Sequence, residues 1–225
     1  MPDLSYLRFM KASAQTGSSS SLRLVRGTKP FADASDAALI EAFARGEPGS
    51  AAELYDRLAG VIRGTLYKML GAETPDFDDL VQTSFEQVVL TLRRRSFGQE
   101  CRLTSWGGAI ASHVALNAIR RVRNERARIA PTSADATFTL PVAGVDLHEQ
   151  VAARRELERL RSTLSEMRRD RAVAVILCDV LGHTLEEAAS AESVSVAALQ
   201  SRLTRGRSEL RQRFEETAIR IGGAS

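Results

Sequence analysis

Residues 184–211 read as two consecutive helices joined by a tight turn, and this pattern constrains the fold more than any other. Thr184 and Glu187 have the spacing of a capping box, which satisfies backbone N–H groups at the start of the first helix. Ser195 can cap the second helix. One face of the second helix is expected to point inward: Leu199, Leu203, Gly206 and Leu210. The opposite face carries groups able to bind phosphates or base edges: Gln200, Ser201, Thr204, Arg205, Ser208 and Arg211. A polar, basic second helix is what reading a DNA major groove requires, although a solvated charged face has the same composition.

The composition favours an all-α protein. The chain has 225 residues, of which 44% are hydrophobic and only 5% aromatic, so the cores must be built from Leu, Val, Ile and Ala. No strand-like alternation of useful length occurs. We therefore expect two small helical domains joined by a flexible linker, the C-terminal one a helix-turn-helix.

The charge is unevenly distributed, although the net charge is only +3. Residues 102–128 carry six arginines against Glu125, a net charge of +5, and residues 197–213 carry a net charge of +4. Between them, residues 129–150 have no Lys or Arg and a net charge of −3. Two basic segments on either side of an acidic one suggest a polyanion contacted at two places, although solvated Arg-rich helices would look similar.

Turn residues and apolar spacing set the expected boundaries. The segments are a flexible N-terminal tail (1–30), a first helical domain (31–128), an acidic linker (129–148), the helix-turn-helix domain (149–216) and a C-terminal tail (217–225). Within the first domain, residues 46–49 interrupt two amphipathic helices.

The middle of the first domain predicts a helix with a polar outer face. After Asp76, the inward positions are Phe77, Val81, Phe85, Val88 and Leu92. The outward positions are Asp79, Gln82 and Glu86. Residues 93–103 then read as a basic loop.

A long helix is expected from Ser105 to about Arg128, capped by Thr104. Its inward stripe is Ala111, Val114, Ala115, Ala118 and Val122. A second stripe contains Trp106, Ile110, His113, Asn117 and Arg120. Bases stack on aromatic rings and phosphates pair with arginine, so this stripe would suit separated DNA strands. For Trp106 alone, ordinary core packing is the favoured interpretation.

Other function classes find little support. Cys101 and Cys178 lack metal-ligand spacing, as do the three histidines, so we expect no disulfide framework and no metal. We find no catalytic residues, no phosphate-binding loop and no Gly-x-Ser-x-Gly motif, and expect no enzyme activity, no cofactor and no small-molecule substrate. The longest apolar run, 172–178, is too short to span a bilayer, and no secretory signal is recognisable, so we expect a cytoplasmic protein without membrane insertion.

Three segments, in order, resemble one family. Residues 78–85 (Asp-Asp-Leu-Val-Gln-Thr-Ser-Phe) resemble its Glu/Asp-Asp-Leu-Val-Gln-x-x-Phe helix. Residues 106–121 resemble its Trp-Leu-x-x-Ile-Ala-x-Asn-x-x-x-Asp-x-x-Arg helix, and residues 194–207 its Ile-Ser-x-Gly-Thr-Val-Lys-Ser-Arg-Leu-x-Arg-Ala-Arg helix. The chain thus resembles the extracytoplasmic-function sigma factors, the small two-domain initiation subunits of bacterial RNA polymerase.

The resemblance implies partners and residue roles. Core polymerase would be bound at the clamp of its largest subunit and the flap of its second largest, with the clamp contacted by Asp79, Leu80, Gln82 and Glu86. The promoter −10 element would be held and melted by Arg93, Arg94, Arg95, Arg102, Trp106, His113, Asn117, Arg120 and Arg121. The −35 element would be bound by Gln200, Ser201, Arg202, Arg205, Arg207 and Arg211. The acidic linker would thread the polymerase channel, and an anti-sigma factor is expected because the family exposes both DNA-binding faces when free.

The chain also departs from the family pattern. In the −10 helix, His113 replaces the usual Asn and Asn117 replaces the usual Asp. Gly107 and Gly108 weaken the start of this helix by up to about 1 kcal/mol each relative to alanine. In the C-terminal domain, Met167-Arg168 stands in place of Leu-Pro, and Gln200 in place of Lys. Glu192 occupies a usually apolar position, where a carboxylate is costly unless the helix rotates or a partner satisfies it.

Two alternatives remain open from the sequence. One is a helix-turn-helix DNA-binding regulator that never engages polymerase, although this would leave the Asp-Leu-Val-Gln helix unexplained. The other is a degenerate sigma-like protein that titrates a partner.

Overall fold

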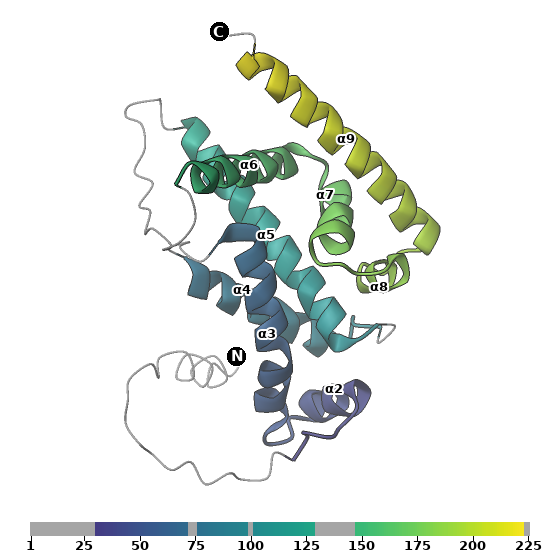
Figure 1. The fold of residues 1–225 in the computed structure, drawn as a ribbon. Coiled ribbons are helices and arrows are strands. Elements are labelled where there is room, and N and C mark those ends of the chain that lie inside the picture. Colours follow the sequence, from purple (N-terminus) through teal and green to yellow (C-terminus); the bar gives the residue numbers. More distant parts are fainter. Residues whose placement is uncertain (1–29, 72–75, 99–100, 129–146, 223–225) are drawn as a thin grey trace, which may run out of the picture. The chain divides into compact units, whose positions relative to one another are not determined.

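The computed structural model describes residues 30–71, 76–98, 101–128 and 147–222, and every regular element among them is a helix (Figure 1). This confirms the predicted all-α class. Residues 1–29 of the predicted N-terminal tail and residues 129–146 of the predicted linker lie outside the described residues. From Phe31 onward, the described residues form one compact unit.

The first helices are α2 (Asp36–Arg45), α3 (Ser50–Leu70), α4 (Phe77–Arg93) and α5 (Leu103–Arg128). The Ser35 hydroxyl caps α2 by accepting from the Ala38 N–H at 3.2 Å. Gly46 and Gly49 have φ angles of 75° and 86°, a left-handed conformation that glycine adopts without steric cost. The predicted interruption at residues 46–49 is therefore confirmed.

The core of these helices lies between α3 and its neighbours. On α3, Leu58, Ile62 and Leu66 are fully buried at 0% exposure. On α5, Leu103 and Leu116 are equally buried. Burying one such side chain contributes about 1.5–3 kcal/mol, so this apolar stripe is the main force holding α5 against the rest.

Arg57 of α3 joins the segment before α2 to the core. Its guanidinium donates to the Asp36 carboxylate at 3.0 Å and to the Glu53 carboxylate at 2.9 Å. It also donates to the backbone carbonyls of Phe31 and Ala34 at 2.8 and 2.7 Å. Burial lowers the pKa of Arg57, but the hydrogen bonds to the two carboxylates outweigh this effect and raise the pKa overall. One side chain thus positions residues that are 20 or more places away in sequence.

The remaining helices are α6 (Leu147–Glu166), α7 (Arg169–Val175), the π-helical segment η1 (Ile176–Val180), α8 (Leu185–Ala191) and α9 (Val196–Gly222). The capping box of α8 is confirmed, since Thr184 and Glu187 each bond the backbone N–H of the other. The Ser195 hydroxyl accepts from the Ala198 N–H at 3.2 Å, as the predicted cap of α9 requires. The helix-turn-helix predicted from the sequence is therefore present.

Gly206 lies where α9 packs tightly against α7. Leu199, Leu203 and Gly206 are buried on the same face, as predicted, whereas Leu210 of the predicted inward stripe is half-buried. A Cβ at Gly206 would lie 2.8 Å from a Val175 methyl carbon and 3.0 Å from the Arg171 carbonyl oxygen. These distances are too short for ordinary packing, so the missing side chain lets the two helices come together.

Several boundary predictions were wrong. Helix α5 begins at Leu103 rather than Ser105, because the Leu103 N–H donates to the Asp36 carboxylate at 3.0 Å and needs no cap from Thr104. Residues 217–222, predicted as part of the C-terminal tail, continue α9. Val122, expected to face inward, is 40% exposed, so the buried stripe of α5 ends at Ala118.

Candidate nucleic-acid interface

The loop before α5 presents a cluster of cations. The arginines expected to contact the −10 element are all exposed there: Arg93, Arg94, Arg95 and Arg102. Arg95 has a φ of 51°, a left-handed conformation uncommon outside glycine.

Trp106 lies inward rather than on the outer stripe. It is 7% exposed, and its ring centroid is 4.4 Å from that of Phe97. The prediction that it shares the outer face of α5 was therefore wrong, and the alternative of core packing describes its position. An aromatic pair of this kind stabilises the base of the basic loop, adding about 0.5–1.5 kcal/mol to area burial.

The outer face of α5 is divided between exposed and covered residues. Asn117 and Arg121 are exposed, and Arg121 pairs with Asp76 at 2.9 Å. His113 and Arg120 are half-buried, because both contact the segment from α6 to α8. The family expectation that both DNA-binding faces are exposed therefore does not describe this part of α5.

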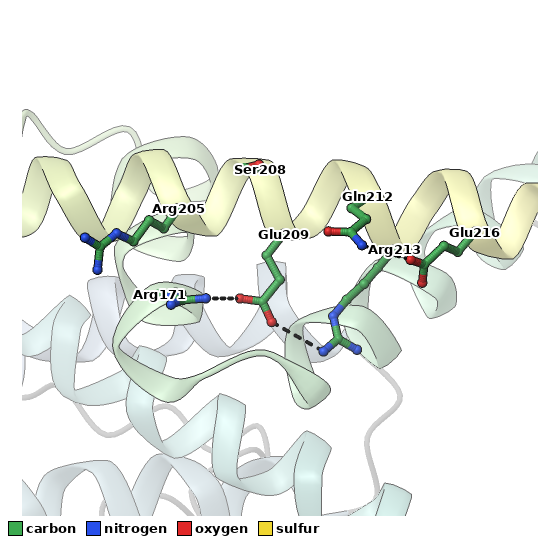
Figure 2. Close-up of a pocket in the computed structure, with 7 residues that line it drawn as sticks. All are labelled: Arg171, Arg205, Ser208, Glu209, Gln212, Arg213 and Glu216. Atoms are coloured by element: carbon green, nitrogen blue, oxygen red, sulfur yellow. Dashed lines mark hydrogen bonds and ion pairs between the residues drawn. The ribbon is translucent and has the colours of Figure 1, made fainter.

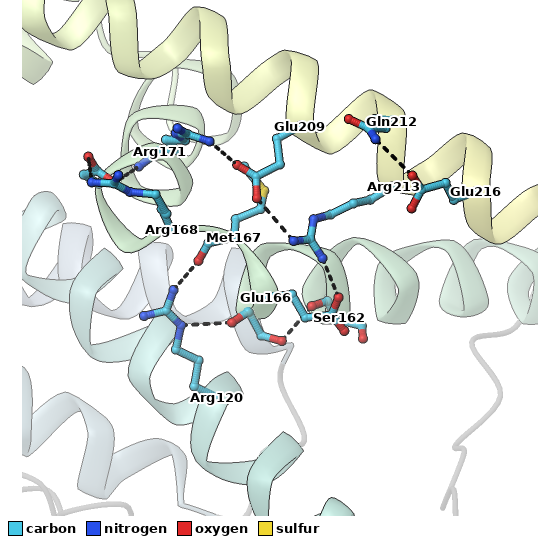
Figure 3. A network of polar contacts seen from close by, with 12 residues as sticks. Arg120, Ser162, Glu166, Met167, Arg168, Arg171, Glu209, Gln212, Arg213 and Glu216 are labelled. Atoms are coloured by element: carbon cyan, nitrogen blue, oxygen red, sulfur yellow. Dashed lines mark hydrogen bonds and ion pairs between the residues drawn. The ribbon is translucent and has the colours of Figure 1, made fainter.

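Arg120 binds the chain where α6 ends (Figure 3). It donates to the Ser165 carbonyl oxygen at 3.1 Å and to the Met167 carbonyl oxygen at 2.7 Å. The last carbonyls of a helix lack partners within it, so Arg120 satisfies groups that would otherwise need water. Burial lowers the pKa of Arg120, and the positive charges of Arg169 and Arg123 lower it further. These three arginines together favour a negatively charged group close to Arg120.

His113 bridges two charged residues of the helix-turn-helix domain. Arg169 Nε donates to its Nδ1 at 3.2 Å, and its Nε2 lies 2.8 Å from Glu192 Oε1. Arginine has no acceptor, so Nδ1 must be unprotonated, and Nε2–H then donates to the Glu192 carboxylate. The imidazole thus links Arg169 to Glu192.

The second helix of the helix-turn-helix, α9, carries the residues expected at the −35 element. Gln200, Arg205 and Arg211 are exposed, whereas Ser201 and Arg202 are half-buried. A surface depression of about 560 Å³ lies beside them. Its lining residues, drawn in Figure 2, are Arg171, Arg205, Ser208, Glu209, Gln212, Arg213 and Glu216. Glu209 lies between Arg171 and Arg213, at 2.8 and 3.3 Å, and offsets their charges. Arg205 is therefore the cation at this surface best placed to meet DNA.

Arg207 has a carboxylate partner within the protein. Its guanidinium donates to both Asp179 oxygens, at 3.0 and 2.6 Å, and these bonds raise the pKa of Arg207. A DNA phosphate would have to compete with Asp179 for this side chain.

The outer face of α4 is acidic and polar. Asp79 and Gln82 are exposed and Glu86 is half-buried, with the Gln82 amide donating to Glu86 at 2.9 Å. Leu80, expected to contact polymerase, is only 8% exposed and belongs to the core. The Leu80 side chain therefore packs α4 against the core and does not form part of the outer face of the helix.

Two family models match the chain. The model for Sigma-70 region 2 matches residues 54–125, and that for Sigma-70, region 4 matches residues 157–210. Together they cover more than half of the chain, in the order the three motifs require. The chain belongs to the extracytoplasmic-function sigma factors. It is therefore an RNA polymerase sigma factor, and promoter-specific initiation is its function.

Individual relatives are more distant. The RNA polymerase sigma factor CarQ of Myxococcus xanthus is 28% identical over 184 residues, which are 81% of this chain and 99% of CarQ. The structure of CnrH in complex with the cytosolic domain of CnrY has 21% identity and a TM-score of 0.46, covering 79% of this chain and 96% of CnrH. The sigma factor RpoE in complex with the anti-sigma factor NepR, from Bartonella quintana, has 19% identity and a TM-score of 0.43, covering 72% and 97%.

The alternatives left open by the sequence are not favoured. The region 2 match contains α4, so a regulator independent of polymerase leaves that match unexplained. The region 4 match contains both Met167 and Glu192, the departures that suggested a degenerate, titrating protein. A sigma factor accounts for both matches.

The described residues form neither a metal-binding cluster nor a membrane-spanning helix. No cluster of three or more His, Cys, Asp or Glu side chains that could hold a metal ion occurs among them. None of the helices described is both long and apolar enough to cross a membrane.

Sequence reasoning missed the partners that cover His113 and Arg120. No sequence pattern marks Arg169, Ser165 or Met167 as partners for this face. Glu192 and His113 are each unusual for the family, but no sequence pattern pairs them.

Proposed function

We propose that this sigma factor docks on the clamp of core polymerase through the outer face of α4. The observation that carries the proposal is the division of this helix. Val81, Phe85 and Val88 are buried, which leaves Asp79 and Gln82 exposed on the polar face of the helix. The clamp contact involves Asp79, Gln82 and Glu86, with Leu80 holding the helix from inside.

The −10 element is proposed to bind along the basic loop and α5. Extruding a base from a DNA stack costs a few kcal/mol, so cations and hydrogen-bonding groups near the extruded base must offset this cost. The exposed Arg93, Arg94, Arg95 and Arg102 supply the charge, and Asn117 and Arg121 an accessible polar edge. His113 and Arg120 join them when the second domain no longer covers them.

The −35 element is proposed to bind α9. Gln200, Ser201 and Arg202 carry sequence information, whereas Arg205 and Arg211 anchor the backbone. Arg207 adds a phosphate contact when it exchanges Asp179 for DNA. The domain then rests on the flap of the second largest polymerase subunit, with residues 129–148 in the polymerase channel.

The sigma factor itself performs no covalent chemistry in this proposal and needs no cofactor, since the polymerase supplies the catalytic site. It acts in the cytoplasm, where polymerase and promoters are. An anti-sigma factor is its proposed regulatory partner.

Run-off transcription tests the proposed function. Purified core polymerase, the sigma factor and fragmented genomic DNA from the same organism are combined, and transcript starts are sequenced. We expect discrete starts with shared upstream motifs, and their loss in the double variant Asp79→Ala with Gln82→Ala. Gln87→Ala, an exposed residue of the same helix outside the proposed contact, is the control that keeps them. Polymerase binding without starts would indicate a titrating protein, and absence of polymerase binding would refute the proposal.

Arg205→Ala is expected to weaken binding of the polymerase holoenzyme to a promoter found in that experiment by about tenfold, the effect of one lost phosphate or base contact worth 1–3 kcal/mol. Fluorescence anisotropy at moderate salt measures it. Gln212→Ala, also exposed on α9, should leave the affinity unchanged. Equal affinities for both variants would remove Arg205 from the interface.

A further inference from the structure

The unusual residues of the two sigma regions meet each other. His113 stands where the family has Asn, and Glu192 where it has an apolar residue, and the two are hydrogen-bonded at 2.8 Å although 79 positions separate them. The Glu192 side chain is only 13% exposed and that of His113 29%. A carboxylate so far withdrawn from water requires a donor, and His113 provides it.

The backbone beside the third departure is part of the same contact. Met167 stands where the family has Leu, directly before the position of the missing Pro, and its carbonyl accepts from Arg120. Arg123 of α5 donates to the Ser165 hydroxyl at 3.1 Å. At the other end of the contact, a Cβ at Gly108 would lie 3.6 Å from His183 Nε2 and 3.8 Å from a Leu181 methyl carbon. The contact thus extends along α5 from Gly108 to Arg123.

The groups used in this contact are those that DNA would need. A carboxylate oxygen and two carbonyl oxygens occupy the donors of His113 and Arg120, in positions that phosphate or base acceptors would otherwise take. A donor already directed at one acceptor cannot be directed at another in a different place. Binding of the second domain and binding of DNA at these two side chains therefore exclude each other.

We propose that the α5 face formed by His113 and Arg120 is a docking surface for this chain's own helix-turn-helix domain, held by Glu192, and that the free sigma factor must break this contact before it binds −10 DNA. The competition with DNA rests on the proposed function; the intramolecular contact does not. The Glu192 carboxylate accepts the hydrogen bond that a DNA acceptor would otherwise accept. Glu192 is not among the residues proposed to contact DNA or polymerase.

The variant that removes only this contact is Glu192→Leu, which places an apolar residue there and removes the acceptor for His113. Glu192→Gln is its matched control, because the amide oxygen can still accept from His113 Nε2–H. A hydrogen bond to a charged group is worth enough to change an equilibrium by a factor of about ten to a hundred, so Glu192→Leu should shift the population toward the open form by that factor. Far-UV circular dichroism checks that both variants retain their helices.

Two measurements test the His113–Glu192 contact itself, independently of DNA binding. Small-angle X-ray scattering of the full chain without polymerase should show a larger radius of gyration for Glu192→Leu than for the wild type, with Glu192→Gln close to wild type. In nitrogen-detected NMR, the His113 Nε2 signal should show a bound proton in the wild type and change in Glu192→Leu. Identical scattering and identical imidazole signals in all three proteins would overturn the proposed contact.

The competition is tested with a fluorescent single-stranded oligonucleotide carrying the −10 sequence, measured against the sigma factor alone. Glu192→Leu is expected to bind it about tenfold more tightly than the wild type does, as the open fraction rises. Expansion without tighter binding would keep the docking contact and refute its competition with DNA. Failure of the run-off experiment combined with expansion of Glu192→Leu would refute the proposed function and leave the docking surface standing.

Discussion

Replacing Arg57 with alanine is expected to lower the free energy of unfolding by about 3 kcal/mol, because it leaves a buried carboxylate without its cation. Glu53, whose side chain is 10% exposed, loses the guanidinium at 2.9 Å, and Asp36 loses its partner at 3.0 Å. The carbonyls of Phe31 and Ala34 lose their donor as well. Urea denaturation followed by circular dichroism measures the change, with an unchanged m-value showing that stability alone is altered.

Arg63→Ala is the matched control on the same helix. Its ion pair with Asp78 joins side chains that are 49% and 77% exposed, and such a pair contributes less than about 1 kcal/mol. Adding Glu53→Gln to Arg57→Ala should recover part of the lost stability, since the uncompensated charge is then gone. If Arg57→Ala and Arg63→Ala lose equal stability, the buried network does not hold the N-terminal segment.

Gly206→Ala is expected to lower the free energy of unfolding by about 2 kcal/mol, although alanine is the better helix former. The new methyl group would overlap a Val175 methyl carbon at 2.8 Å and the Arg171 carbonyl oxygen at 3.0 Å. Valine is stiff at χ1 and the carbonyl belongs to the backbone, so neither can move aside without shifting α7 or α9. Thermal and urea denaturation both measure the loss.

Gly64→Ala gives the opposite sign and serves as the control. Gly64 lies within α3, and a Cβ there would meet nothing within 4 Å. The substitution should therefore raise stability by about 1 kcal/mol through helix propensity alone. A stabilising Gly206→Ala would show that α9 is not held as close to α7 as the structure places it.

The local elements of this fold could be predicted from the sequence because their signals are local. Capping of α8 depends on Thr184 and Glu187, three positions apart, and the buried stripe of α9 on spacings of three and four residues. Such patterns record which face of a helix is apolar. These patterns predicted the helix-turn-helix and the polar face of α4.

Features that depend on distant residues could not be predicted in the same way. The start of α5 is set by Asp36, 67 positions earlier, and the burial of Trp106 depends on Phe97 in the preceding loop. The pairing of His113 with Glu192 joins two sigma regions. The spacing of apolar residues can show that a charged side chain faces inward, and such a charge requires a partner. It does not identify that partner. The candidate site was therefore predicted as a set of residues, without the contact that covers part of it.

Asp36 has a consequence for the order in which the protein is made. Its carboxylate accepts from Arg57 and from the Leu103 N–H, and Leu103 leaves the ribosome 67 residues after it. At about 5–20 residues per second, several seconds of translation separate the two. Throughout that interval α2 and α3 can pair, but the buried leucines of α3 have no α5 to cover them. A ribosome that stalls in this interval would therefore leave an apolar face of α3 exposed until α5 emerges.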